Sequence, residues 1–378
     1  MAKERIASIE YIRGIAMLGV IGIHTGAYSL SNPHVNIHLF ALLEIVSRFS
    51  VPIFFFVSAF GLFLHDDLSK PFRYLSFLTR RAKAVLLPYI LWSLLYMTHY
   101  TWISGDSLIW EKPLFYEFFL FGLASYQLYF LVILLWFYAL MPLWRLLVRH
   151  MLKAPRSWLT VLLGCQIAVN YWSTHLLDVS FTNHYLAMAL QHRVSYWVIH
   201  YLFIFLFGAL CARQYGEWIA FLRDRQQTVY AFFFFTLTAM LGTYYYLLAS
   251  GRSAEQAVNI TQQLSPPGVL YTASTTAFLL IILESVKLPH GLRAGLAKLG
   301  EHSYAVYLVH PFVMYYLMEY LTDHQIVMTA TVVICFYMAT VLTSLAVAQA
   351  IRESAKLLPF VSLLLTGTHG RAVKQQSG

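Results

Sequence analysis

Apolar runs of about twenty residues recur along the whole chain and are separated by shorter polar segments. An α-helix needs a run of this length to cross the roughly 30 Å of hydrocarbon in a bilayer. The pattern therefore predicts an all-α polytopic membrane helix bundle of about ten transmembrane helices. They are expected at residues 9–29, 40–64, 82–103, 126–146, 158–175, 196–212, 228–250, 268–286, 303–321 and 327–349.

The composition agrees with a membrane protein. The 378 residues are 59% hydrophobic and 11% charged, and the mean hydropathy is +0.62. A soluble domain cannot cover that much apolar surface with its own polar residues, so lipid is the expected solvent. Cys165, Cys211 and Cys335 each lie in an apolar run, and their spacing predicts neither a disulfide nor a metal site.

Lys and Arg side chains indicate the orientation, because they remain on the cytoplasmic side when they lie in short loops. With the N-terminus inside, 21 of the 26 Lys and Arg residues lie in cytoplasmic segments, and only Lys112, Arg193 and Arg252 lie outside. This asymmetry predicts an even number of spans with both termini in the cytoplasm. It also accounts for the net charge of +9 without a nucleic-acid partner.

No internal repeat or linker divides the chain. We therefore expect one transmembrane domain at residues 1–366, followed by a disordered cytoplasmic tail at 367–378. The first span is expected to remain in the mature protein, because Arg13 and His24 interrupt the apolar run that a cleavable signal peptide requires.

Two ionisable residues in the first span are candidates for chemistry, because such groups are costly in a bilayer unless they are paired or face a wet interior. Arg13 and His24 are eleven residues apart, a spacing that returns to within about 20° of the same helix face and separates them by about 16 Å along the axis. We expect Arg13 near the cytoplasmic end and His24 in the outer half, lining one shared channel. Taken alone, His24 is also compatible with a purely interhelical hydrogen bond.

The second span carries Glu44 and Arg48, one helical turn apart and able to pair with each other. Two interpretations stay open. The pair is either a structural ion pair, or one member orients His24 or binds the second substrate.

Five motifs occur in one order along the chain. They are Tyr11-Ile12-Arg13-Gly14 with His24 eleven residues after Arg13, PIFFFVSAFG at 52–61, FLTRRAKAVLLP at 77–88 followed by Tyr89, QLYFLVILL at 127–135, and LGEHSYAVYLVHP at 299–311. Each is short and weak alone, but together they resemble the integral-membrane acyltransferase 3 family. Glu10 stands where that family has Asp before its Arg-Gly, and Ala59 replaces a glycine after Ser58.

The resemblance implies roles for individual residues. His24 would be the essential catalytic residue, with Arg13 as its partner for acyl-CoA use, and Arg80 and Arg81 would belong to a basic loop that handles the donor. Supporting positions that match the family are Glu10, Ser58, Tyr304 and His310.

The resemblance also implies a reaction, the transfer of an acyl group, with acetyl favoured, from acetyl-CoA or another acyl-CoA to a hydroxyl. The acceptor would be a glycan, a glycolipid or a related molecule of the cell envelope, and the location a bacterial cytoplasmic membrane. A neutral imidazole can remove the hydroxyl proton, which makes His24 the expected general base. A covalent acyl-histidine is the alternative.

A basic cluster, defined as Lys70, Arg73, Arg80, Arg81 and Lys83, is suited to the phosphates of CoA. Simple positive-inside topology explains the same charges, and both explanations can hold together. His310 precedes Pro311, so it is either a second proton carrier or a partner for the carbonyl that the proline leaves free.

Two other functions remain open. A transporter or flippase for a lipid or sugar would also use intramembrane Arg, Glu and His, although such proteins often contain repeated halves. The second of these hypotheses is a non-catalytic sensor or scaffold. The sequence leaves the oligomeric state open between a monomer and a homo-oligomer.

Overall fold

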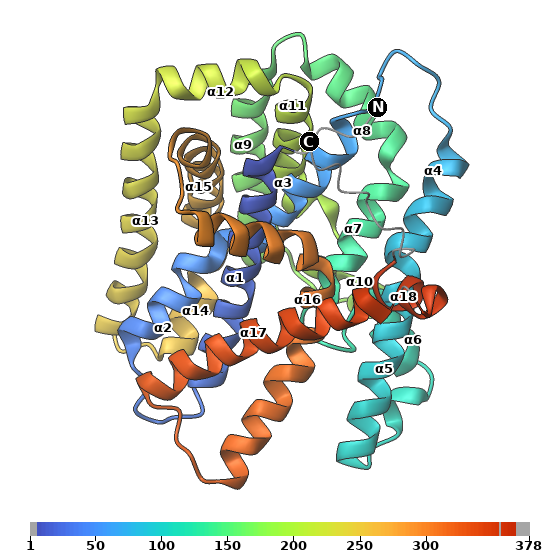
Figure 1. The fold of residues 1–378 in the computed structure, drawn as a ribbon, viewed down its shortest axis with the longest axis vertical. Coiled ribbons are helices and arrows are strands. Elements are labelled where there is room, and N and C mark those ends of the chain that lie inside the picture. Colours follow the sequence, from blue (N-terminus) through green and yellow to red (C-terminus); the bar gives the residue numbers. More distant parts are fainter. Residues whose placement is uncertain (1–5, 355–356, 368–378) are drawn as a thin grey trace.

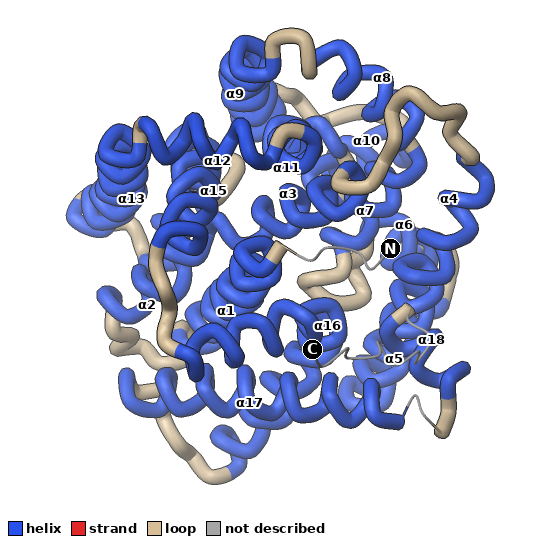
Figure 2. Tube along the Cα trace, turned by 45° about the horizontal axis from the view of Figure 1, so that its top comes forward, coloured by secondary structure: helices blue, strands red, loops and turns tan. Residues whose placement is uncertain are grey.

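A computed structural model of the protein describes residues 6–354 and 357–367. Within these ranges the chain forms helices and connecting turns, with no strand (Figure 2). Its α-helices are α1 (Ala7–Ser29), α2 (Ile37–Glu44), α3 (Ser50–Phe63), α4 (Tyr74–Arg81), α5 (Leu87–Ser104), α6 (Leu114–Phe121), α7 (Tyr129–Ala139), α8 (Met141–Met151), α9 (Pro155–Tyr171), α10 (His184–Gln191), α11 (Leu202–Arg213), α12 (Tyr215–Asp224), α13 (Gln226–Ala249), α14 (Ala254–Ile260), α15 (Pro266–Ser285), α16 (His290–Asp323), α17 (Ala330–Ser354) and α18 (Pro359–Thr366). The predicted tail lies outside the described residues, apart from Gly367.

The expected number of ten spans is too high by length and composition. Among the described residues, four helices are long and apolar enough to cross a membrane: the continuous helical segment Ile37–Phe63, α13, α15 and α17. Two bent pairs, α7 with α8 and α11 with α12, raise the number to six if each pair is one span. The all-α architecture is confirmed for the described residues, and their long apolar helices are those expected of a membrane protein.

The remaining expected spans do coincide with helices, but those helices are less apolar or shorter. The helix α1 carries Glu10, Arg13 and His24, and α9 has 17 residues, at the short end for a bilayer crossing. The prediction from apolar runs included these helices because it took no account of the polar residues within them.

Both bent pairs change direction at an identifiable break. The angle between α7 and α8 is 70°, and Pro142 lies in the first turn of α8, where a proline starts a helix but cannot continue one. The angle between α11 and α12 is 104°, so α12 lies across the end of the bundle between α11 and α13 (Figure 1). The polar residues of α8 and α12 therefore lie at one end of the molecule instead of extending a span.

The helix α1 lies near the centre of the bundle, where it packs on α16 along one side and on α2 and α3 along another (Figures 1 and 2). Glycines allow both contacts. A Cβ on Gly14 would lie 3.2 Å from the carbonyl carbon of Leu296, and one on Gly300 would lie 3.0 Å from that of Glu10. On the other side, a Cβ on Gly26 would lie 2.6 Å from Cγ of Glu44.

Replacing Gly300 with alanine is expected to destabilise the protein by about 1–3 kcal/mol, because the added methyl group meets backbone that cannot rotate away. Gly295, also on α16, has no atom within 4 Å of its ideal Cβ position. Alanine there is expected to stabilise the helix by roughly 0.5–1 kcal/mol. Unfolding in detergent measures both variants, and equal effects at the two positions would contradict the close contact.

Candidate active site

His24 lies in the last two turns of α1, with its imidazole beside two other rings. The ring centroids of His24 and Tyr126 are 4.2 Å apart, and those of His24 and His310 are 5.4 Å apart with 24° between the planes. His24 is half-buried and makes no hydrogen bond with any described residue. The bundle therefore holds a free imidazole in a largely aromatic setting.

His310 lies in α16 and is fully buried. Its Nδ1 is 3.2 Å from the carbonyl oxygen of Val306, which can only accept, so Nδ1 donates and the neutral ring leaves Nε2 without a proton. Nε2 is buried and has no hydrogen-bond partner among the described residues. The bond to Val306 satisfies only one side of the ring, and it differs from the expected bond to the carbonyl of Tyr307, which Pro311 leaves free.

Glu44 and Arg48 form the expected ion pair, with 2.8 Å between Glu44 Oε2 and Arg48 Nη2. Only 4% of the Glu44 side chain and 13% of the Arg48 side chain are exposed. Arg48 Nη1 also approaches Oε1 of Gln263 at 3.5 Å. Because Glu44 packs on Gly26, two residues after His24, the pair lies at the depth of the imidazole.

Arg13 lies near the start of α1, with Nη1 3.5 Å from Oε2 of Glu10, and makes no other polar contact with a described residue. Since α1 is one uninterrupted helix, the predicted spacing from Arg13 to His24 holds. However, Met17, Val20 and Ile21 occupy the same side between them, and each is at most 1% exposed. The expectation of one open channel from Arg13 to His24 is therefore wrong for this conformation.

An aromatic layer reinforces this separation. The Phe54 ring centroid lies 6.0 Å from that of Phe130 and 6.3 Å from that of Tyr307. One turn further along their helices, away from His24, come Ser58 and Tyr304. Ser58 is half-buried without a polar contact to a described residue, and the buried Tyr304 hydroxyl has no partner among them.

Three cations of the basic cluster are exposed and make no ion pair or hydrogen bond with a described residue. Arg73 immediately precedes α4, Arg80 lies in its last turn, and Lys83 lies in the π-helical segment Ala82–Leu86 that follows. These positions leave the three charges available to an anionic ligand.

The other two members of the cluster are engaged. The Arg81 guanidinium lies 5.3 Å from the ring centroid of Tyr138. Lys70 Nζ lies 3.2 Å from Asp67 Oδ2. The Ser69 hydroxyl donates to Asp67, which lowers the pKa of this carboxyl to about 2 and keeps it ionised beside Lys70. Lys70 is therefore less available to a ligand than its position in the sequence indicates.

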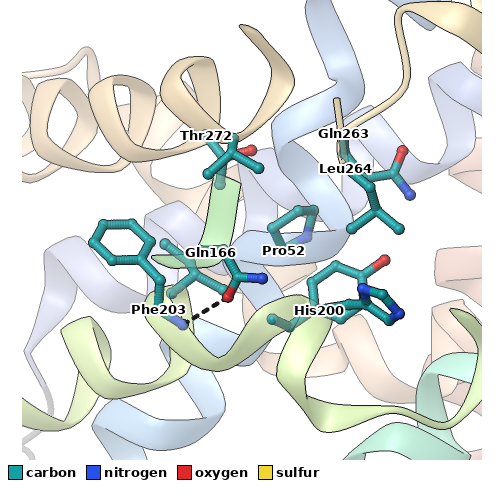
Figure 3. A pocket seen from close by; sticks show the side chains of 10 residues that line it. Pro52, Gln166, His200, Phe203, Gln263, Leu264 and Thr272 are labelled. Atoms are coloured by element: carbon teal, nitrogen blue, oxygen red, sulfur yellow. Dashed lines mark hydrogen bonds between the residues drawn. The ribbon is translucent and has the colours of Figure 1, made fainter. Parts of the chain in front are cut away.

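Two pockets lie elsewhere in the bundle. One is a half-open hollow of about 260 Å³ whose lining includes Gln166, His200, Gln263 and Thr272, which Figure 3 shows around it. The other is a more open hollow of about 600 Å³ with an apolar wall that includes Trp136. Neither pocket is lined by Arg13 or His24.

Sequence reasoning missed Tyr126 and Gln263. Tyr126 directly precedes the QLYFLVILL motif, which is the only local signal for it. Nothing near Gln263 indicates its approach to Arg48. Within the described part of the chain, no group of three or more His, Cys, Asp and Glu side chains is arranged to hold a metal ion.

The model of a family described as an acyltransferase domain, acyltransferase 3, matches residues 6–349. No curated protein and no solved structure matches the chain.

Proposed function

The chain belongs to the acyltransferase 3 family, and on that premise we propose that it moves an acyl group, acetyl in the first instance, from acyl-CoA to a hydroxyl of a cell-envelope glycan or glycolipid. Membership of the family implies an acyl donor and a hydroxyl acceptor. The donor and acceptor classes are part of the proposal, as is a bacterial cytoplasmic membrane with both termini in the cytoplasm.

The observation that carries the mechanism is the free imidazole of His24 inside the bundle. Transfer requires a base to remove the hydroxyl proton while the oxygen attacks the thioester carbon and the C–S bond breaks. An imidazole without a competing hydrogen bond is available for this task. The same position suits a covalent acyl-histidine, in which the ring nitrogen attacks the thioester first.

Donor binding is assigned to the side of the basic cluster, which is cytoplasmic in the proposed orientation. The exposed Arg73, Arg80 and Lys83 would contact the phosphates of CoA, and Arg13 would lie along the pantetheine arm. The packing of Met17 and the aromatic layer around Tyr307 must open for the thioester to reach His24. Substrate-driven rearrangements of this kind are common in enzymes that exclude water.

The acceptor is assigned to the opposite side of His24. Glu44 and Arg48 lie at this depth and offer one carboxylate and one guanidinium to a hydroxyl-rich molecule. The two sides together make the reaction vectorial, with the donor taken from inside and the acceptor from outside or from the membrane.

A reconstitution experiment separates this function from transport. Purified protein in proteoliposomes is given acetyl-CoA radiolabelled in the acetyl group, with and without envelope extract, and both label transfer and free CoA thiol are measured. We expect label on an extract component and one equivalent of CoA thiol released. Movement of a lipid or sugar across the bilayer without thioester consumption would instead establish the transporter alternative.

Replacing both Arg80 and Lys83 with alanine is expected to raise the KM for acetyl-CoA about three- to tenfold and to leave kcat nearly unchanged, because exposed charges each contribute roughly 0.2–1 kcal/mol. Steady-state kinetics measure this, with Arg223→Ala on α12 as a matched basic control. The variant should also discriminate less between acetyl-CoA and its 3'-dephospho form. An unchanged KM would indicate that these charges do not bind CoA and serve only to orient the protein in the membrane.

A further inference from the structure

We propose that His310 is the positioning residue of His24, accepting an N–H of that imidazole on its bare Nε2 and so fixing which nitrogen of His24 faces the substrates. This inference rests on the proposed function of His24. It adds a second histidine with a defined tautomer and a defined task.

The tautomer of His310 follows from its single hydrogen bond. Nδ1 donates to the Val306 carbonyl, so Nε2 carries a lone pair and requires a donor. This atom is buried and unpartnered among the described residues, an arrangement that is unfavourable as long as no donor meets it. A buried acceptor held in this state indicates a donor that arrives with the functional conformation.

The neighbouring rings leave one donor for this acceptor. Tyr307 and Tyr126 have ring centroids 5.9 Å and 6.3 Å from that of His310. The Tyr307 hydroxyl already donates to the Gln127 carbonyl, and the Tyr126 hydroxyl is directed to the Met314 sulfur at 3.7 Å. His24 is the nearest of the three rings and has no hydrogen bond of its own with a described residue.

The separation is close to that of a hydrogen-bonded imidazole pair. Two imidazoles joined edge to edge by one N–H···N bond have centroids about 5 Å apart, given a donor–acceptor distance of about 2.9 Å. The observed centroid distance of 5.4 Å is close to this value, but the rings lie in a stacked arrangement with 24° between their planes, so the His24 ring must turn its edge toward Nε2 of His310 to form the bond. Catalytic hydrogen bonds are often long before substrates bind.

The proposed pair keeps the reaction balanced. The nitrogen of His24 that faces the substrates takes the hydroxyl proton as the O–C bond forms, and returns it to the CoA thiolate as the C–S bond breaks. The other nitrogen of His24 keeps its proton and donates to His310 throughout. His310 thereby stabilises the imidazolium, as the third member of a catalytic triad does for its histidine.

Two substitutions of His310 separate positioning from packing. His310→Asn keeps an amide N–H near the position of Nδ1 and removes the Nε2 acceptor, whereas His310→Gln places an amide oxygen near the position of Nε2. We expect the Asn variant to lower kcat about 10²- to 10⁴-fold with the KM for acetyl-CoA within about threefold. The Gln variant should recover at least about tenfold of that loss.

The matched control is His324→Asn. His324 also directs Nδ1 to the carbonyl four residues earlier, that of Tyr320 at 2.9 Å, but it is exposed beyond the end of α16. Its replacement should leave kcat unchanged. Equal losses in His310→Asn and His310→Gln, or full turnover in His310→Asn, would overturn the positioning role.

An activity-independent measurement tests the same pairing if the acceptor or the reaction differs from the one proposed. In protein labelled with ¹⁵N-histidine, the His310 signals should report a protonated Nδ1 and an unprotonated Nε2, assigned with the His310→Gln variant. With CoA bound, the Nε2 signal should move when His24 is replaced by alanine. A protonated Nε2, or a signal indifferent to His24, would overturn the pairing. An absence of acyl transfer with this NMR signature intact would refute the proposed reaction alone.

Discussion

Replacing His24 with alanine is expected to lower kcat for acyl transfer by about 10²- to 10⁴-fold, the range that a positioned general base contributes. The physical reason is the lack of a substitute: the nearest rings are those of Tyr126 and His310, and Nδ1 of His310 is already bonded to the Val306 carbonyl. Turnover is measured at saturating acetyl-CoA as both labelled product and released CoA thiol.

His38→Ala serves as the control, because His38 is an exposed histidine on α2 whose Nδ1 meets the Tyr245 hydroxyl. Its turnover should equal that of the wild type. Turnover of His24→Ala within about tenfold of the wild-type value would exclude His24 as the base. Quenching of single turnovers in neutral denaturant adds a further distinction, since label bound to wild-type protein and absent from His24→Ala would support an acyl-histidine.

Replacing Arg48 with alanine is expected to destabilise the folded protein by about 3–5 kcal/mol, because Glu44 would remain buried without its counter-charge. The loss is read from unfolding in detergent. The double variant Glu44→Gln with Arg48→Gln removes both charges and should regain most of the stability. Little loss in Arg48→Ala would show that Glu44 does not depend on this partner.

The double variant also decides between the two interpretations of the ion pair. A folded protein with normal turnover would assign Glu44 and Arg48 a structural role. A folded protein with a raised KM for the acceptor and an unchanged KM for acetyl-CoA would assign them to acceptor binding.

The positions of the helices were largely predictable, because apolar length and proline placement are local properties of a chain. The number of membrane spans was not, since the same apolar length serves a straight span such as α13 and a bent pair such as α7 with α8. The break at Pro142 is a local signal that the length criterion overlooked.

The part of the candidate site that lies on α1 was also predictable from a local property of the sequence. Helical periodicity places Arg13 and His24 on one face, but it carries no information about what packs there, so the buried Met17 and Ile21 between them were not foreseen. The meeting of His24 with His310 depends on contacts between opposite ends of the chain. The glycines that let α1 approach α16 are the one sequence feature that indicates this contact. The spacing of glycines along the sequence does not show which helix each of them contacts.

The glycine contacts between α1 and α16 have a mechanical consequence. They join an early helix to a late one, with backbone against backbone at Gly14 and Gly300, which opposes a relative rotation of the two described segments that carry α1 and α16. Helix α1 carries His24 and helix α16 carries His310, so this closely packed pair of helices holds both histidines. Entry of the thioester then depends on small changes in side-chain packing around α1 and α16. A cross-link between these two helices would therefore leave turnover intact. It would abolish turnover in any mechanism that requires α1 and α16 to move apart.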